Sequence, residues 1–298
     1  MNIDYLKLFV RVAHLTNITK AGAEFGLSST VASTHLNKLE ESLNVRLLHR
    51  TTRKVSLTEE GSAFLPHAQE ILAAIDYATS TLGGSTPTPK GTLRITAPSS
   101  FGRFHLMPFI DKFMKCNPEL DVELHLSDSM VDLIEGGFDL AIRNAELKDS
   151  SLIAKKLATD QRIIVASPNY IEKHGQPETP LELKSHQCIN LFGNTQWVFK
   201  SDNGNIHVKT SGAFKTNDGE AVLDACIKGM GVVMTANWMA YKALKRGEVV
   251  RVLSEYPLVS DAAIWAVYPT TKLLAPKVRA FIDFFAAQYE SPPYWDNN

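Results

Sequence analysis

The first 58 residues alternate short helical stripes of apolar side chains with turn signals. Apolar positions between residues 6 and 13 recur at helical spacing and predict one apolar helix face. A second short helix is predicted over residues 18–25, and Gly26 suits the left-handed position that follows it. Ser28 can cap a third helix that runs to about residue 43. A helix, a tight turn and a second helix have the spacing of a helix-turn-helix.

Two short apolar runs, residues 45–48 and 55–57, flank a polar turn and predict a two-stranded wing. The turn and its borders are rich in basic side chains, namely Arg46, His49, Arg50, Arg53 and Lys54. A basic turn beside a solvent-facing helix is what contacts to phosphate groups require. The alternative interpretation of this stretch is a solvated loop.

A single long helix is predicted over residues 59–82, and Pro66 should kink it or loosen its first turns. Its apolar positions repeat at intervals of four and three residues, as in the seam of a coiled coil. They are Phe64, Ala68, Ile71, Ile75, Ala78 and Leu82. Such a stripe can also pack on its own domain. Since no globular sequence surrounds the helix, pairing with a second copy is favoured, with Phe64, Ile71, Ile75 and Leu82 as dimerisation residues. Residues 83–90, rich in Gly, Pro and Thr, predict a hinge.

From residue 91 the pattern changes to short apolar runs that alternate with helical stretches, which is typical of an α/β domain. We expect two lobes, lobe I from residues 91–160 and 266–298 and lobe II from residues 161–265. The predicted strands are 93–97, 121–126, 138–142, 162–166, 231–235 and 263–268, with a hairpin around residues 202–205. The predicted helices are 101–114, 130–135, 168–173, 219–229 and 276–288.

Composition and charge distinguish the first 58 residues from the rest of the chain. With 298 residues, 44% hydrophobic and 21% charged, the chain fits about two soluble domains, and no apolar run reaches the ~18 residues that a membrane span needs. The net charge of −1 hides eight basic and four acidic side chains in the first 58 residues, which suggests that this part meets a polyanion. Cys116, Cys188 and Cys226 are far apart, which argues for reduced thiols and a cytoplasmic protein without a leader segment. Cys116 and Cys226 lie on stretches predicted to be packed helices.

No motif of a catalytic site is present: the chain has no Walker A sequence, no His-Glu-x-x-His and no Gly-x-Ser-x-Gly. We therefore expect neither an enzyme nor a metal or other cofactor. Polar side chains do follow the predicted strands, where ligands of open α/β sheets bind. They are Ser99, Ser100, Asp128, Arg143, Thr216 and Asn217. These residues can converge on a cleft between the lobes and hold a small polar or anionic effector, or each can be a helix cap or turn former.

Taken together, the sequence resembles the LysR-type transcriptional regulators over its whole length. The resemblance is carried by residues 9–13, 21–28, 39–48, 50–51 and 57–61, and further on by residues 163–168, 229–231 and 276–283. It implies a winged helix-turn-helix, a dimerising linker helix and a two-lobed effector domain like a periplasmic binding protein. It also implies a homotetramer that binds inverted-repeat operator DNA, responds to a small-molecule effector and has RNA polymerase as a further candidate partner.

The resemblance also assigns DNA contacts residue by residue. The recognition helix begins at Ser28, and the major groove is faced by Ser29, Thr30, Ser33, Thr34 and Lys38, with Arg50 and Arg53 of the wing on phosphates or the minor groove. The chain departs from the family at Ser29 (often Pro or Gln), Thr34 (usually Arg) and Ala236 (commonly Pro). The operator sequence therefore does not transfer from relatives.

Two other classes of protein fit parts of the sequence. A solute-binding protein would explain the two-lobed region, but it would leave residues 1–82 without a role. An enzyme on the same scaffold would need a nucleophile and base, and none is evident. An effector-responsive transcription factor accounts for all parts of the chain.

Overall fold

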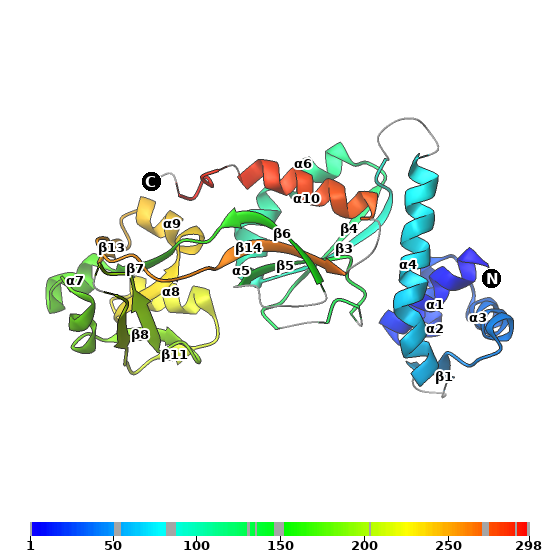
Figure 1. Cartoon of the computed structure of the whole chain (residues 1–298), viewed down its shortest axis with the longest axis horizontal. Coiled ribbons are helices and arrows are strands. Elements are labelled where there is room, and N and C mark those ends of the chain that lie inside the picture. The colour runs from blue at the N-terminus through cyan, green and yellow to red at the C-terminus, as the bar shows by residue number, and fades with distance from the viewer. Residues whose placement is uncertain are drawn as a thin grey trace.

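The computed structural model describes residues 2–50, 55–81, 88–129, 132–134, 136–145, 152–202, 204–269, 274–289 and 291–296. It shows a helical N-terminal domain, a long helix and an elongated α/β domain of two lobes, in that order along the chain (Figure 1). These are the parts that the sequence predicts.

The N-terminal domain is a winged helix-turn-helix. Its elements are α1 (Ile3–Leu15), α2 (Ile18–Glu24), α3 (Ser29–Leu43), β1 (Leu48–Arg50) and β2 (Val55–Leu57). Asn17 and Ser28 cap α2 and α3 through their side chains, and Gly26 between them has a φ of 68°. The strands β1 and β2 pair antiparallel as the wing, and residues 51–54 at its tip, including Arg53, lie outside the described residues.

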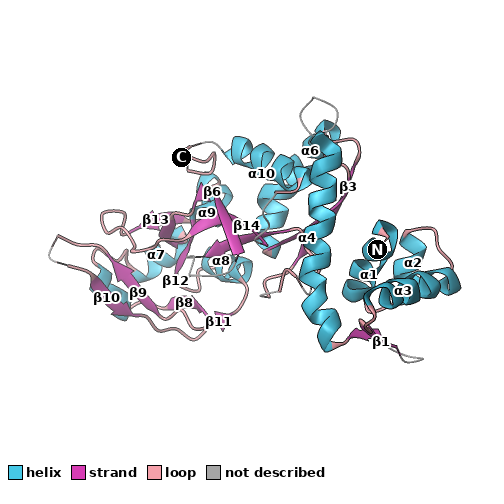
Figure 2. Ribbon diagram, turned by 45° about the vertical axis from the view of Figure 1, so that its right-hand side comes forward, coloured by secondary structure: helices cyan, strands magenta, loops and turns pink. Residues whose placement is uncertain are grey.

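Helix α4 (Glu59–Thr81) runs as one ribbon past Pro66 (Figure 2). Thr58 caps its start, because the Thr58 hydroxyl accepts a hydrogen bond from the Gly61 amide at 2.9 Å. The first half of the predicted dimer seam packs within the chain: the Phe64 ring lies 5.8 Å from that of Phe9, and Ile71 joins the same core. Phe64 and Ile71 are only half-buried by these contacts, so their assignment to a dimer contact stays a prediction. Leu82 lies outside the described residues.

Lobe I is a five-stranded sheet in the order β4-β3-β5-β14-β6. Its strands are β3 (Gly91–Ala97), β4 (Leu120–Leu126), β5 (Leu140–Ala145), β6 (Leu152–Thr159) and β14 (Ala263–Pro269). Its helices are α5 (Ser99–Phe101), the π-helical η1 (Gly102–Leu106), α6 (Met107–Cys116) and α10 (Pro276–Tyr289).

Two predictions for lobe I are wrong. Of the helix predicted over residues 130–135, residues 133 and 134 form a turn, residue 132 has no regular structure, and the other three lie outside the described residues. The boundary at residue 266 is three residues late, because β14 pairs with both β5 and β6 from Ala263 onward.

Lobe II is a second five-stranded sheet, in the order β11-β8-β12-β7-β13. Its strands are β7 (Arg162–Ala166), β8 (Cys188–Leu191), β11 (Lys215–Thr216), β12 (Val232–Ala236) and β13 (Val250–Val252). Its helices are α7 (Pro168–His174), the 3-10 helix η2 (Pro180–Lys184), α8 (Gly219–Ile227) and α9 (Asn237–Lys245). The predicted hairpin is confirmed as β9 (Gln196–Phe199) paired with β10 (Ile206–Lys209).

An aromatic joint fixes lobe I to lobe II. His105 of η1 is fully buried, and its Nε2 lies 3.0 Å from the carbonyl oxygen of Trp238 in α9. Its Nδ1 lies 2.6 Å from the hydroxyl of Tyr294, in the C-terminal segment that follows α10. Trp295 of that segment is also fully buried, and its carbonyl accepts a hydrogen bond from Asn237. The sequence did not predict this C-terminal connection to lobe II.

The N-terminal domain docks on lobe I through alternating charges. Arg11 of α1 pairs with Glu24 of α2 at 2.5 Å, and Arg94 of β3 pairs with Glu123 of β4 at 2.9 Å. Across the junction, Arg94 lies 3.7 Å from Glu24 and Arg11 lies 3.9 Å from Glu123. His14 lies beside them against Gly137, and its pKa is lowered to about 4, first by burial and then by the neighbouring arginines. The four charges thus complement one another across the junction.

Arg94→Glu is expected to release this docking, because it sets a third carboxylate against Glu24 and Glu123 at a cost of about 2 kcal/mol. Small-angle X-ray scattering should then show a larger radius of gyration than for the wild type. Arg246→Glu, on a side chain 66% exposed at the end of α9, is the control and should leave the scattering unchanged. A radius of gyration equal for all three proteins would contradict the docking.

Candidate nucleic-acid interface and effector site

Helix α3 presents a polar outer face because its inner face is fixed by apolar packing. Ala32, Leu36 and Leu39 are buried at helical spacing in the core of the N-terminal domain. The side chains predicted to face DNA fall on the other side: Ser28, Ser29, Thr30, Thr34 and Lys38 are exposed, and Ser33 is half-buried. The structure therefore brings all six together on one surface.

Several of these polar side chains are already held by hydrogen bonds within the domain. The Thr34 hydroxyl donates to the carbonyl oxygen of Thr30 at 3.0 Å, and the Thr19 hydroxyl donates to the hydroxyl oxygen of Ser29 at 3.2 Å. The Ser28 hydroxyl accepts from the amide of Val31 at 3.3 Å. These side chains are short, and the hydrogen bonds hold them close to the helix. They can therefore reach a base only where the helix itself approaches the base closely.

Arg50 joins the wing to the recognition helix. Its guanidinium donates to Asn37 and to Glu40 of α3, both at 2.6 Å. The other oxygen of the Glu40 carboxylate accepts from the amides of Leu47 and Leu48 at 2.8 and 3.0 Å. Arg50 therefore orients the wing against α3, and a role as a free phosphate contact is secondary. Glu40 and Asn37 were not singled out from the sequence, since their role depends on contacts seven to thirteen residues away.

The effector residues predicted in lobe I meet at one edge of its sheet. Ser99 and Ser100 follow β3, Asp128 follows β4, and Arg143 lies near the end of β5. Because β4 and β5 both pair parallel with β3, these strand ends lie at the same edge of the sheet. The Asp128 carboxylate accepts a hydrogen bond from the Ser99 amide at 3.0 Å. This amide is therefore occupied within the chain, and the effector contacts of Ser99 and Asp128 stay predictions. Ser100 is buried, and burial lowers the pKa of the half-buried Arg143.

The predicted residues of lobe II lie at the start of α8. Thr216 accepts a hydrogen bond from the Asp218 amide at 3.2 Å, and Asp218 in turn caps α8 through the amides of Glu220 and Ala221. Asn217 between them is exposed. An ion pair between Arg103 of η1 and Glu220 connects the helix after Ser99 with this turn. This ion pair brings the element that carries Ser99 and Ser100 close to the turn of Thr216, and Thr216 itself stabilises that turn.

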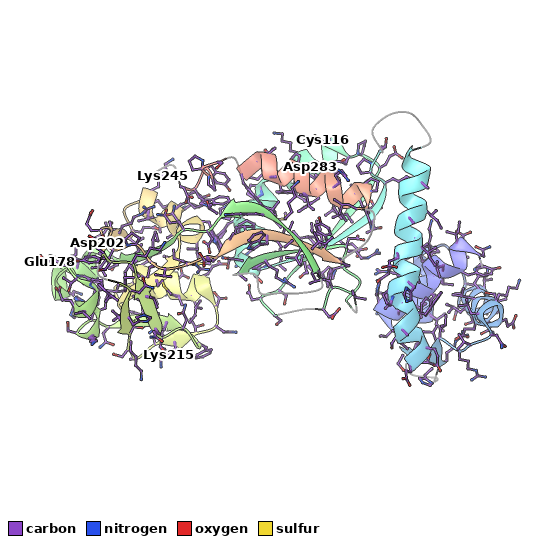
Figure 3. The ribbon with its side chains drawn as sticks, in the orientation of Figure 1. Cys116, Glu178, Asp202, Lys215, Lys245 and Asp283 are labelled. Atoms are coloured by element: carbon purple, nitrogen blue, oxygen red, sulfur yellow. The ribbon has the colours of Figure 1, made fainter. Side chains whose placement is uncertain are left out.

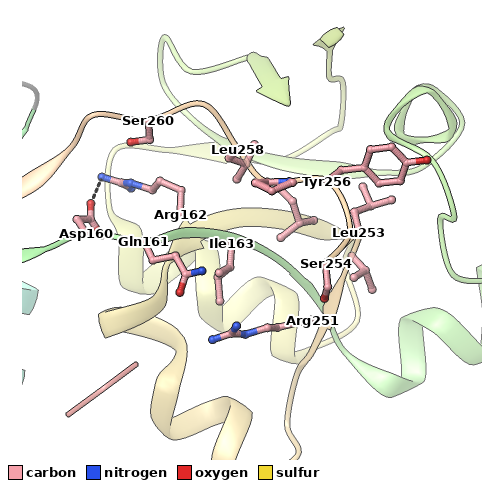
Figure 4. Close-up of a pocket in the computed structure, with 13 residues that line it drawn as sticks. Asp160, Gln161, Arg162, Ile163, Arg251, Leu253, Ser254, Tyr256, Leu258 and Ser260 are labelled. Atoms are coloured by element: carbon pink, nitrogen blue, oxygen red, sulfur yellow. Dashed lines mark ion pairs between the residues drawn. The ribbon is translucent and has the colours of Figure 1, made fainter. Parts of the chain in front are cut away.

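A cavity of about 220 Å³ lies elsewhere, at the β7–β13 edge of lobe II (Figure 4). It is lined from residues 160–164 on one side and 251–260 on the other, and none of the six predicted effector residues belongs to its lining. Arg162 in this wall pairs with the buried carboxylate of Asp160 at 2.9 Å. Strand alternation places Arg162 and Arg251 on opposite faces of the sheet, so their charges do not converge on one ligand.

The three cysteines occupy different environments. Cys116 is exposed at the end of α6 beside α10 (Figure 3), so its prediction as a packed residue is wrong. Cys188 and Cys226 are buried, and burial raises the pKa of each thiol to about 12. These two thiols therefore stay protonated at neutral pH, which makes them poor nucleophiles.

The described part of the chain contains neither a cluster of metal ligands nor a membrane-spanning helix. No group of three or more His, Cys, Asp or Glu side chains there is arranged to hold a metal ion. No described helix is both long enough and apolar enough to cross a membrane.

Comparison with known proteins places both halves of the chain in one family. Residues 3–62 match the bacterial regulatory helix-turn-helix proteins of the lysR family, and residues 87–290 match the LysR substrate binding domain. The chain is 34% identical to the HTH-type transcriptional regulator DmlR of Escherichia coli (strain K12), covering 98% of this chain and 95% of that protein.

Solved structures of similar proteins agree. CrgA, a LysR-type transcriptional regulator from Neisseria meningitidis, matches with a TM-score of 0.61 and 30% identity over 96% of this chain and 98% of its own. Full-length AphB, a virulence activator of Vibrio cholerae, matches with a TM-score of 0.60 and 30% identity over 96% and 99%. The chain therefore belongs to the LysR-type transcriptional regulators, as a DNA-binding helix-turn-helix protein with a two-lobed effector-binding domain.

Proposed function

We propose that the chain binds inverted-repeat operator DNA as a homotetramer and that a small-molecule effector between lobe I and lobe II changes its effect on transcription. The observation that carries the DNA-binding part is the outer face of α3. It presents exposed Ser, Thr and Lys side chains, and the Glu40–Arg50 pair holds it against the basic wing. This geometry is suited to the major groove, with the wing on the adjacent backbone.

The assembly would use the apolar seam of α4. Phe64, Ile71 and Ile75 are half-buried and Ala78 is exposed in the single chain. Apolar positions at this spacing pair well with a second copy of the helix. RNA polymerase is a further partner that fits a regulator of this family.

The effector would lie between the strand ends of the two lobes, near Ser100, Arg143 and Asn217. A serine, an arginine and an amide suit a small polar or anionic molecule. We infer that the chain acts by binding and not by catalysis, because its sequence contains no nucleophile and base motif of the common catalytic classes. We also infer that it acts in the cytoplasm and needs no metal or other cofactor.

Footprinting on the DNA upstream of the protein's own gene, repeated over a series of salt concentrations, tests the proposal. A protected inverted repeat whose affinity falls steeply with salt is expected, because phosphate contacts release counterions. Failure to protect any genomic fragment would refute the DNA-binding function.

Lys38→Ala should weaken binding to every DNA sequence and reduce the slope of log K against log salt by about one, since it removes one positive charge from the DNA-facing side of α3, close to the phosphates that border the groove. Lys215→Ala is the matched control, because Lys215 is exposed on lobe II (Figure 3). Equal slopes for the Lys38→Ala chain and the wild type would exclude Lys38 as a phosphate contact.

A further inference from the structure

Val31 is an exposed aliphatic side chain on the polar face of the recognition helix. It lies in the first turn of α3 and is 41% exposed, whereas Ala32, Leu36 and Leu39 of the same helix are at most 1% exposed. The hydrogen bond from its amide to the Ser28 hydroxyl fixes it in the N-terminal turn. Recognition helices contact base edges with their N-terminal residues.

Thr34 and Lys38 lie three and seven residues after Val31 and therefore share its stripe along the helix. The Thr34 hydroxyl donates its hydrogen to the carbonyl oxygen of Thr30 at 3.0 Å. What the exposed Thr34 side chain retains for a base is a methyl group and an oxygen acceptor. Val31 and Thr34 thus place methyl groups side by side, with the Lys38 ammonium further along the same stripe.

In the major groove, the C5-methyl group of thymine is the apolar group of the base edges, and the other groups there are hydrogen-bond donors and acceptors. We propose that Val31, supported by the Thr34 methyl group, determines specificity by contacting the C5-methyl group of one thymine in each operator half-site. This inference rests on the proposed function, in which α3 enters the major groove.

The short neighbours of Val31 favour such a contact. Ser29, Thr30, Ser33 and Thr34 are too short to reach across a gap as an arginine or glutamine would. A helix that reads bases with these residues must lie close to the groove floor, where a methyl–methyl contact excludes water from both groups. Cytosine at the same position would offer no methyl group.

The test replaces each thymine of the protected half-site in turn by deoxyuridine, which removes only the methyl group. Affinities of the full-length wild type and Val31→Ala are measured by fluorescence anisotropy. At one position, deoxyuridine should weaken wild-type binding about fourfold, the value for one buried methyl group. The same substitution should have almost no effect on the Val31→Ala chain, whereas substitutions at the remaining thymines should affect both proteins equally.

Val259→Ala is the matched control, because Val259 is 40% exposed in lobe II, and its pattern should equal that of the wild type. Val31→Ala should fold, since Val31 is not in the core and alanine favours helix; circular dichroism checks this. A wild type that protects its operator while no deoxyuridine effect depends on Val31 would overturn this inference and leave the proposed function standing. A wild type without any site-specific binding would overturn both.

Discussion

Gly61→Ala is expected to destabilise the N-terminal domain by about 3 kcal/mol and to remove most specific DNA binding. A Cβ atom on Gly61 would lie 2.0 Å from the carbonyl oxygen of Leu47 and 2.9 Å from its carbonyl carbon. Both are backbone atoms. The Leu47 carbonyl oxygen accepts a hydrogen bond from the Thr58 amide at 3.0 Å, and the Leu47 amide donates a hydrogen bond to the Glu40 carboxylate. Neither side of the contact can move alone, so α4 must separate from the segment that leads into the wing.

Two probes separate this effect from a general loss of folding. All four tryptophans lie in the effector domain, so tryptophan fluorescence should report an unchanged transition for that domain. Circular dichroism and DNA affinity should report the loss in the N-terminal domain. Glu60→Ala, on the exposed neighbour, should cost no more than about 0.5 kcal/mol. Wild-type affinity and stability in the Gly61→Ala chain would show that the backbone yields at this point.

The N-terminal domain could be predicted in detail because its signals are local. The caps Asn17 and Ser28, the glycine at position 26 and the apolar stripes each act within one or two helical turns. The need for glycine at position 61 is not local, since the atom that excludes a side chain belongs to Leu47. A sequence shows this glycine only as a weak point in a helix.

The effector domain was predicted less completely, because strand pairing joins distant residues. Residues 152–159 and 263–269 pair as β6 and β14. Because of this pairing, the return to lobe I begins at residue 263 and not at the predicted residue 266. The C-terminal segment carries no periodic pattern, and its position depends on the packing of Trp295 and its bond to Asn237.

The candidate site divides in the same way. The family resemblance assigned the DNA-facing residues of α3, and the structure places them on the side of the helix away from the core. What their polar atoms do depends on tertiary partners: Arg50 is held by Glu40, and Asp128 accepts a hydrogen bond from the Ser99 amide of the neighbouring strand end. Residue types at strand ends do not reveal such partners, so the individual contacts of these side chains required the structure.

The joint between the lobes should make the effector domain lose stability in acid. Burial lowers the pKa of His105 to about 4, against a smaller opposing effect of its hydrogen bond to the Trp238 carbonyl. The unfolded chain has a histidine pKa near 6.5, so protons bind the unfolded state more strongly. The stabilising contribution is fully present above pH 6.5 and is lost as the pH falls from 6.5 to 4. At 1.36 kcal/mol per pKa unit the loss amounts to about 3 kcal/mol.

Denaturant unfolding of the full chain at several pH values, followed by tryptophan fluorescence, measures this loss. Trp238 and Trp295 are suitable reporters, because their rings lie 5.6 and 4.5 Å from that of His105. His105→Gln keeps a donor for the Trp238 carbonyl but does not titrate. It should therefore flatten the dependence of the free energy of unfolding on pH between pH 6.5 and 4. It should also lower the free energy of unfolding at pH 7. His207→Gln, on an exposed histidine of β10, should keep the wild-type dependence. An equally steep dependence in the His105→Gln chain would show that another group binds the protons on unfolding, and that the joint between the lobes does not respond to acid through His105.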